Sequence, residues 1–137
     1  MSLSITVTGG IGPVMERMKR AMEGLIRRTA DLAETEMRRR APVRTGELRR
    51  SIKKRIDVPN LSAEIGPGVK YAIFVEMGTR PHVIRPVRAR ALRFEVGGEV
   101  VFAAYVHHPG TKPQPFVRGT AEEVRRRIPG LWLEAWR

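Results

Sequence analysis

Apolar residues recur at helical spacing near the start of the chain and predict one long helix over residues 13–40. The apolar stripe consists of Val14, Met18, Ala21 or Met22, Leu25, Thr29, Leu32 or Ala33, and Met37. Pro13 suits the first helical position, where its missing N–H would have no partner anyway, and Pro42 ends the helix. Such a helix is about 40 Å long. We expect it either to overhang the core and pack on another subunit, or to lie across a sheet.

Alternating apolar and polar residues predict two β-hairpins in the middle of the chain. Residues 52–58 and 61–65 form the first, around the turn Pro59-Asn60. Residues 92–96 and 100–106 form the second, around Gly97-Gly98, which is a strong signal for a two-residue turn. Phe94, Phe102 and Tyr105 lie on the strands of the second hairpin, and we interpret them as a row that faces the core.

A short apolar helix is expected between the hairpins, at residues 71–77. Gly78 follows, where a helix end favours a residue without Cβ, and Pro81 prevents continuation of the helix. Because Phe74 and Val75 make the helix too apolar for a surface position, we expect the neighbouring sheet segments to close over it. It then acts as a core plug, and a direct contact with a partner is the alternative.

The ends of the chain are less regular. A short strand is predicted at residues 4–8, and residues 107–115 hold three prolines in nine positions and are expected to be irregular. A last helix is predicted at residues 116–128, with Pro129-Gly130 as its breaker. Two tryptophans near the C-terminus indicate docking of this tail, onto a partner or onto the chain's own sheet.

These elements predict an α+β fold, with the long N-terminal helix and the C-terminal helix packed on a small, mostly antiparallel β-sheet that has a short central helix. At 137 residues, a single domain (1–137) is expected. It divides into an N-terminal strand and linker (1–12), a core (13–128) and a tryptophan-containing tail (129–137).

The chain is strongly basic, with 26 lysines and arginines, 14 acidic residues and a formal charge of +12. Such a charge predicts attraction to phosphate or to an acidic protein surface. The basic residues are spread over the chain, however, and 21 of them are arginines, so charge by itself does not define a nucleic-acid site. No cysteine is present, no apolar run is long enough for a membrane span, and the start does not resemble a secretory signal. We therefore expect a soluble protein made in the cytoplasm.

Catalytic and cofactor motifs are missing from the sequence. The three histidines are His82, His107 and His108, and none belongs to a His-Glu-x-x-His motif. We expect them to hydrogen-bond backbone around the proline-rich segment, and a metal nuclease that uses His107 or His108 is the enzymatic alternative. Residues 9–12 lack the Lys-Ser/Thr ending of a phosphate-binding loop. We therefore predict no catalytic residue, no metal, no cofactor and no enzymatic activity.

Three segments, in order, resemble a family of minor tail components of long-tailed bacteriophages, variously called tail-completion, neck or head–tail joining proteins. Residues 41–52 resemble its AP-x-x-TG-x-L-x-x-SI motif, and residues 71–79 resemble its YA-x-x-VE-x-GT motif. Residues 108–117 resemble its HPGT-x-x-x-PF-[LV] motif, which precedes a closing helix. The similarity spans roughly residues 13–128, and the order of the three motifs makes it specific.

The resemblance implies a non-enzymatic structural protein of a phage or prophage virion that completes the tail and joins it to the head. Family members assemble as a ring, expected to be six-fold, at the head-proximal end of the tail, and can be monomers in solution. The implied partners are further copies of the chain, the tail tube protein and the head-connector or neck proteins. The resemblance further implies that DNA passes nearby without specific binding, that no membrane is involved, and that assembly takes place in the host cytoplasm.

The expected subunit interface comprises Arg44, Thr45, Gly46, Arg80, His82, His108, Lys112, Trp132 and Trp136. A basic nucleic-acid-binding module is the alternative function, and it would require basic residues and exposed aromatic rings on one sheet face.

Overall fold

The computed structural model describes residues 10–137, which form two compact units. Unit 1 holds residues 10–69 together with Phe116–Arg137, and unit 2 holds Lys70–Pro115. The α+β prediction is confirmed. The strand expected at residues 4–8 lies outside the described residues, and the single domain stays a prediction.

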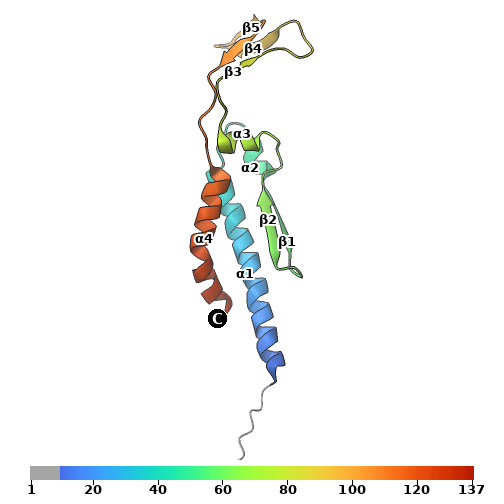
Figure 1. Cartoon of the computed structure of the whole chain (residues 1–137), viewed down its shortest axis with the longest axis vertical. Coiled ribbons are helices and arrows are strands. Elements are labelled where there is room, and N and C mark those ends of the chain that lie inside the picture. Colours follow the sequence, from blue (N-terminus) through green and yellow to red (C-terminus); the bar gives the residue numbers. More distant parts are fainter. Residues whose placement is uncertain (1–9) are drawn as a thin grey trace, which may run out of the picture. The chain divides into compact units, whose positions relative to one another are not determined.

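Unit 1 is built from three helices and one hairpin (Figure 1). Its elements are α1 (Ile11–Arg40), α2 (Glu47–Ser51), β1 (Lys53–Asp57), β2 (Ser62–Gly66) and α4 (Phe116–Ala135). The long helix and the first hairpin therefore form where the periodicity predicts them.

Helices α1 and α4 pack against each other in antiparallel directions (Figure 1). At one end, the Arg17 side chain donates a hydrogen bond to the carbonyl of Trp136 (3.3 Å). At the other, Gly119 lies so close to Arg40 that a Cβ on it would be 3.0 Å from the guanidinium. Small residues such as Ala21, Ala30 and Ala33 are buried on α1, which lets a neighbouring helix approach closely.

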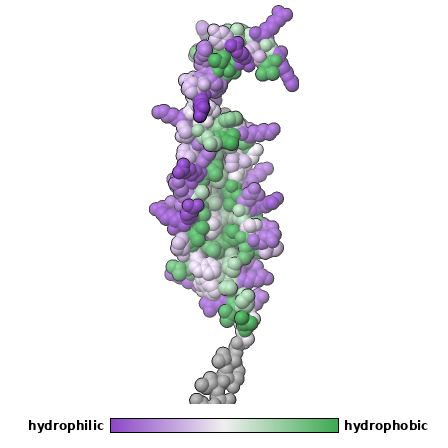
Figure 2. All heavy atoms as spheres, viewed as in Figure 1, coloured by the Kyte–Doolittle hydropathy of each residue, from purple (hydrophilic) through white to green (hydrophobic). Residues whose placement is uncertain are grey.

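Helix α1 extends beyond the end of α4. Its 30 residues correspond to about 45 Å, whereas the 20 residues of α4 correspond to about 30 Å. Because Arg17 already contacts the last turn of α4, the first turns of α1 have no helix beside them within unit 1. Figure 2 shows hydrophobic side chains along the middle of unit 1, with hydrophilic side chains on both margins.

The core of unit 1 lies around the C-terminal half of α1. Ile52 is fully buried, and Met37, Leu48 and Phe116 are nearly so. Thr120 is also buried, and its hydroxyl donates to the Phe116 carbonyl (2.7 Å), so this polar group is satisfied within its own helix. Among residues 10–137, no helix combines the length and the apolar content that a membrane crossing needs.

Hairpin β1–β2 lies on α1 through the face that carries Ile56, Ala63 and Ile65. Lys54 interrupts this face in the sequence, and the structure explains why. Its ammonium pairs with Asp31 and with Glu34 (2.8 Å), both on α1. The cation therefore ties the hairpin to the helix.

Replacing Lys54 by methionine should lower the thermal midpoint by a few degrees at pH 7. Hydrogen bonding to Lys54 holds the pKa of Glu34 below its usual value, and the partners Asp31 and Glu34 raise the pKa of Lys54. The pair therefore stabilises the fold between the usual pKa values of the two groups, about 4.3 and 10.4. Its contribution is lost as the pH falls through the folded-state pKa of Glu34, or rises through that of Lys54.

The measurement is a series of thermal melts from pH 2.5 to pH 8. Lys53→Met is the matched control, because Lys53 lies on the exposed face of the same strand. The difference between wild type and Lys54→Met should disappear at pH 2.5, where the carboxylates are protonated. A difference that is constant with pH would assign the effect to packing.

Helix α4 continues past Pro129, contrary to the prediction that Pro129-Gly130 breaks it. Proline removes one backbone hydrogen bond but does not forbid a helix when tertiary contacts hold both sides of it. Here Ile128, Pro129 and Trp132 face α1 across an apolar groove that is described below. The tryptophan-containing tail is therefore mostly the last part of α4, and Trp136 directly follows the end of the helix.

Unit 2 contains one short helix and two separate strand pairs. Its elements are α3 (Ala72–Met77), β3 (His82–Ile84), β4 (Leu92–Val96), β5 (Glu99–Ala103) and β6 (Val106–His108). Strands β4 and β5 are antiparallel neighbours, with Leu92 opposite Ala103, and β3 pairs antiparallel with β6. The described strands thus form three two-stranded ladders, counting β1–β2, where one small sheet was predicted. The irregular segment also begins later than predicted, because His107 and His108 belong to β6.

The apolar residues of unit 2 are largely exposed, which corrects two predictions. Ile73, Phe74 and Met77 of α3 are each more than half exposed, so α3 is not a covered core plug. Phe94 and Phe102 lie on opposite faces of the β4–β5 ladder, since Phe94 is opposite Val101 and Arg93 is opposite Phe102. Phe102 is 65% exposed, so the predicted core-facing row is wrong. Two short ladders and one helix do not provide enough layers to cover these side chains.

Candidate subunit interface

The first group of predicted interface residues lies on the turn between α1 and α2. Gly46 has a left-handed backbone (φ 81°) and occupies the N-cap of α2. Thr45 lies one residue earlier, where its hydroxyl accepts a hydrogen bond from the Glu47 N–H (3.4 Å) and its carbonyl accepts one from Arg50 (3.3 Å). Arg44 is exposed at this turn. Thr45-Gly46 is therefore a tight turn of the chain, and the exposed guanidinium beside it belongs to Arg44.

The second group lies in unit 2, where β3 and β6 pair. The rings of His82 and His108 stack with their centroids 4.9 Å apart. His82 Nδ1 is 2.7 Å from the Arg80 carbonyl, and the Gly110 N–H donates to His108 Nδ1 (3.0 Å). The expectation that these histidines hydrogen-bond backbone is confirmed for this pair. His107 makes an edge contact with Tyr105 instead.

Beside this pair, the second and third signature motifs are joined by a two-way backbone bridge. Thr79 and Thr111 exchange N–H···O=C hydrogen bonds of 3.1 and 3.0 Å, and their hydroxyl oxygens are 3.1 Å apart. Gly78 and Gly110 flank the bridge with positive φ values of 70° and 81°. Lys112 follows the bridge and is exposed. The glycines of both motifs are therefore required because two segments of the same chain approach each other closely at the bridge.

A shallow hollow of about 560 Å³ opens next to the bridge, within unit 2. Its lining residues are Phe74, Gly78, Thr79, Arg80 and His82. Two predicted interface residues, Arg80 and His82, thus lie beside the exposed aromatic ring of Phe74. Such a mixture of aromatic and arginine side chains is typical of protein–protein contact surfaces.

The third group, the two tryptophans, lies at the end of α4. Trp132 and Trp136 are one helical turn apart, and their rings meet edge to face with centroids at 5.4 Å. The guanidinium of Arg17 lies 5.8 Å from the centroid of Trp136, a cation–π distance. The tail therefore docks on α1 of its own chain, and the sheet that was considered for it is not its partner.

The structure does not bring the first and third groups together. The turn with Thr45 follows the C-terminal end of α1, whereas Trp136 lies beside Arg17 near the N-terminal end. These positions on α1 are 23 residues apart (Arg17 to Arg40), which corresponds to about 35 Å of helix. Unit 1 therefore presents two distinct surfaces, one at each end.

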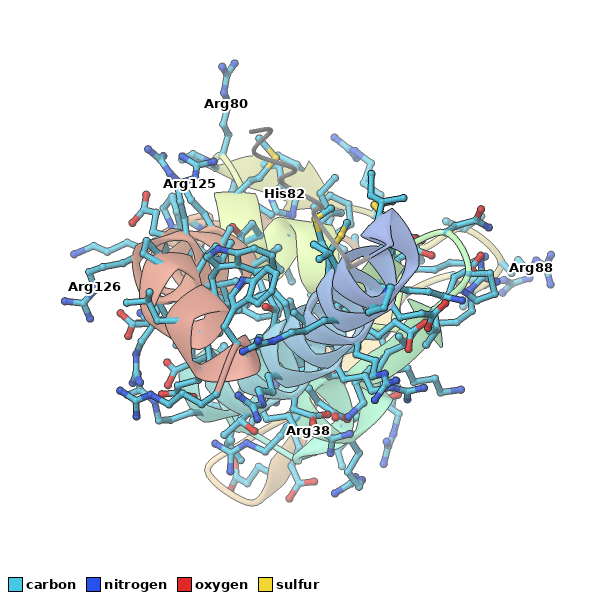
Figure 3. All side chains as sticks on the ribbon, turned by 90° about the horizontal axis from the view of Figure 1, so that it is seen from below. Arg38, Arg80, His82, Arg88, Arg125 and Arg126 are labelled. Atoms are coloured by element: carbon cyan, nitrogen blue, oxygen red, sulfur yellow. The ribbon has the colours of Figure 1, made fainter. Side chains whose placement is uncertain are left out.

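Positive charge dominates both units. Unit 1 carries 19 basic and 11 acidic residues, and unit 2 carries 7 and 3. Many acids of unit 1 are already paired: Arg39 lowers the pKa of Glu36, and Arg127 and Arg126 lower that of Glu123. Figure 3 shows basic side chains, including Arg125 and Arg126, projecting away from the ribbon. The excess of cations over acids is thus available to an acidic partner.

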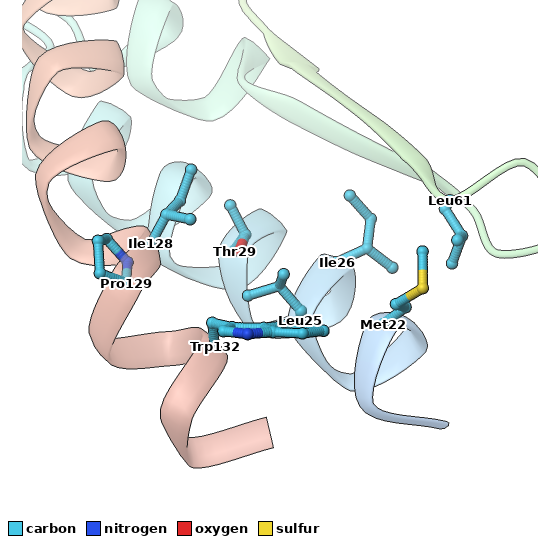
Figure 4. A pocket seen from close by; sticks show the side chains of 8 residues that line it. All are labelled: Met22, Leu25, Ile26, Thr29, Leu61, Ile128, Pro129 and Trp132. Carbon is cyan, nitrogen blue, oxygen red and sulfur yellow. The ribbon is translucent and has the colours of Figure 1, made fainter. Parts of the chain in front are cut away.

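An apolar groove in unit 1 was not predicted (Figure 4). It lies between α1, α4 and the turn of the β1–β2 hairpin, and holds about 480 Å³. Its lining residues are Met22, Leu25, Ile26 and Thr29 of α1, Leu61 of the hairpin turn, and Ile128, Pro129 and Trp132 of α4. The sequence carried one signal for this groove. The last helix was predicted to have only 13 residues (116–128), and a helix of that length cannot cover all the turns over which the apolar stripe of α1 extends.

Metal ligands do not cluster in the part of the chain that the structure describes: no group of three or more His, Cys, Asp or Glu residues is placed to hold an ion. His82 and His108 come together as a pair that already contacts backbone. The geometry of this pair favours a structural role in the β3–β6 ladder over metal chemistry.

These features describe a small α+β scaffold with exposed apolar and cationic groups. Residues 14–78 match the model of a family described as "Bacteriophage HK97-gp10, putative tail-component". The match includes most of α1, all of α2, β1, β2 and α3, and thus the first signature motif and nearly all of the second. The resemblance to a family of phage tail components is therefore confirmed over these residues. No curated protein and no solved structure is significantly similar to the chain.

Proposed function

We propose that this chain is a non-enzymatic structural protein of a phage or prophage virion, which completes the tail and joins it to the head. The family match over residues 14–78 carries this proposal. In the virion the chain forms a homo-oligomeric ring, with six copies, at the head-proximal end of the tail. Its neighbours are the tail tube protein on one side and the head-connector or neck proteins on the other.

The exposed apolar residues of unit 2 support assembly into a ring. A unit of 46 residues without disulfides is marginally stable by itself, and isolated two-stranded ladders are weaker still. Contacts with a neighbouring subunit would cover Phe74, Met77 and Phe102, which are 58%, 69% and 65% exposed. Head-to-tail contacts of this kind close into a ring when the rotation between subunits allows it.

Virions made without this protein test the proposal. Head–tail joining should fail, so that tails and filled heads appear separately in negative-stain images, and the wild-type protein supplied in trans should restore joined particles. Normal, joined particles in the absence of the protein would refute the proposal.

A charge reversal at the predicted interface should have the same effect in weaker form. Lys112 is exposed in unit 2 and is expected to face an acidic surface of a neighbouring protein. Lys112→Glu would place like charges opposite each other, which costs several kcal/mol at an interface, so the yield of joined particles should fall at least about tenfold. Arg55→Glu is the matched control, since Arg55 is exposed on β1 and outside the predicted interface. Equal yields from the two variants would remove Lys112 from the interface.

One observation favours nucleic-acid binding as a second candidate function. Phe102 is exposed beside Arg93 on one face of the β4–β5 ladder, and the Arg85 guanidinium lies 5.4 Å from the centroid of the exposed Tyr105 ring. Basic residues next to exposed rings are the arrangement that stacks single-stranded bases. The aromatic rings of unit 2 are therefore accessible for this role.

Salt-dependent DNA binding separates the two candidates. The structural proposal expects weak binding of a labelled single-stranded oligonucleotide, no tighter than the roughly micromolar non-specific range at physiological salt. Much tighter binding, weakened about tenfold by Phe102→Ala as the loss of one stacked base predicts, would favour the nucleic-acid-binding module.

A further inference from the structure

We infer that the apolar groove of unit 1 binds an amphipathic helical segment of another protein, with acidic residues along the margins of the segment's apolar face. The groove lies entirely within unit 1 and outside the residues predicted for the subunit interface, except for Trp132. The inference therefore does not depend on ring formation or on head–tail joining.

The groove continues along α1 as an exposed apolar stripe, made of Ile11, Val14, Met15, Met18 and Met22. These residues recur at steps of three and four, so they form one ridge on the helix. They are 77%, 64%, 52%, 36% and 36% exposed. Scattered single apolar residues are normal on a protein surface, but a contiguous stripe that leads into a hollow is typical of a binding site.

The dimensions of the stripe and groove fit a helix. Ile11 and Ile26 are 15 residues apart on α1, which corresponds to about 22 Å, or about four helical turns. A second helix laid along α1 would place its own apolar residues, spaced by three or four, between those of the stripe. Large side chains of that helix would enter the groove beside Trp132.

Charge selects an acidic occupant. Unit 1 carries eight more basic than acidic residues, and two exposed cations lie close to the groove. Lys19 lies one turn before Met22 on α1, and Arg125 lies one turn before Pro129 on α4, so each shares its helix face with a lining residue. A partner with carboxylates at its margins would meet these cations, and its association would be faster at low salt.

A second copy of the chain is a poorer occupant. Each copy has a net charge of +12, and the two equivalent basic margins would face each other if two grooves met. Because like charges across an interface oppose association, the groove favours a different, acidic protein over self-pairing.

The test uses the full-length protein and synthetic helical peptides of about four turns. The first peptide carries leucines at steps of three and four and glutamates elsewhere, and the second carries lysines in place of the glutamates. Tryptophan fluorescence reports binding, because Trp132 lines the groove. The acidic peptide should bind at least about tenfold more tightly than the basic one at low salt. No binding, or equal binding of the two peptides, would overturn the inference.

Variants place the binding in the groove. Met22→Glu removes an apolar contact and adds a negative charge at an exposed helical position, so it should weaken the acidic peptide at least about tenfold. Leu133→Glu is the matched control: Leu133 is 66% exposed on α4 and does not line the groove, so the affinity should change less than about twofold. Equal losses in both variants would overturn the inference. Self-association that Met22→Glu abolishes would overturn it as well, because the occupant would then be a second copy.

Discussion

Replacing Ile52 by alanine is expected to lower the free energy of unfolding by about 2–5 kcal/mol, the range for truncating a large buried aliphatic side chain. Ile52 is fully buried and follows α2 directly, at the point where the chain enters β1. Its carbonyl accepts a hydrogen bond from Arg38 of α1 (2.8 Å), so the residue joins the turn, the hairpin and the long helix. Alanine leaves a cavity where these elements meet.

Urea unfolding followed by circular dichroism measures this effect. Val43→Ala is the control, because Val43 is 56% exposed and precedes the same turn, and its effect should stay within about 0.5 kcal/mol. A loss at Ile52 no larger than the loss at Val43 would show that the core is centred elsewhere. The variant also tests the first signature motif, since Ile52 is its last residue.

Replacing Gly110 by alanine is expected to open the bridge between Thr79 and Thr111. Gly110 has a φ of 81°, where an L side chain is strained by about 1–2 kcal/mol. A Cβ there would overlap the Thr79 carbonyl oxygen and lie 2.9 Å from the Arg80 carbonyl carbon, both of them backbone atoms that cannot rotate away. The strain and the overlap act together, so the two bridged segments of the chain must separate.

Hydrogen exchange of the Thr79 and Thr111 amides, which donate across the bridge, measures this opening. Both amides should exchange at least about tenfold faster in Gly110→Ala. Gly98→Ala is a matched control, because Gly98 has a similar φ of 86° but no heavy atom within 4 Å of the added Cβ. Unchanged protection at Thr79 and Thr111 in Gly110→Ala would refute the close-approach explanation. If Gly98→Ala accelerated the exchange of these two amides equally, backbone strain at a positive φ would be sufficient to open the bridge without the overlap.

The structure brings some of the predicted interface residues together and leaves others apart. His82 and His108 do come together, because two segments far apart in the sequence form the paired strands β3 and β6. Of these two residues only His108 lies in a motif of the resemblance, and no periodicity predicts that two three-residue strands will pair. The apolar groove was missed, because Met22 and Ile26 also fit an ordinary core stripe. Their partial exposure depends on where α4 and the hairpin lie along α1.

Local sequence by itself determined the elements of this protein. Helical period fixes α1, and alternation and turn residues fix β1–β2 and β4–β5. Glycines mark most reversals with a positive φ, the turn at Leu61 being the exception, because these preferences act between residues that are neighbours in the chain. Tertiary structure decided the features that local sequence preferences do not determine. It carried α4 through Pro129, placed Lys54 opposite Asp31 and Glu34, and left α3 and Phe102 exposed. Burial depends on which elements meet, and in unit 2 too few layers meet to cover the apolar faces that the sequence encodes.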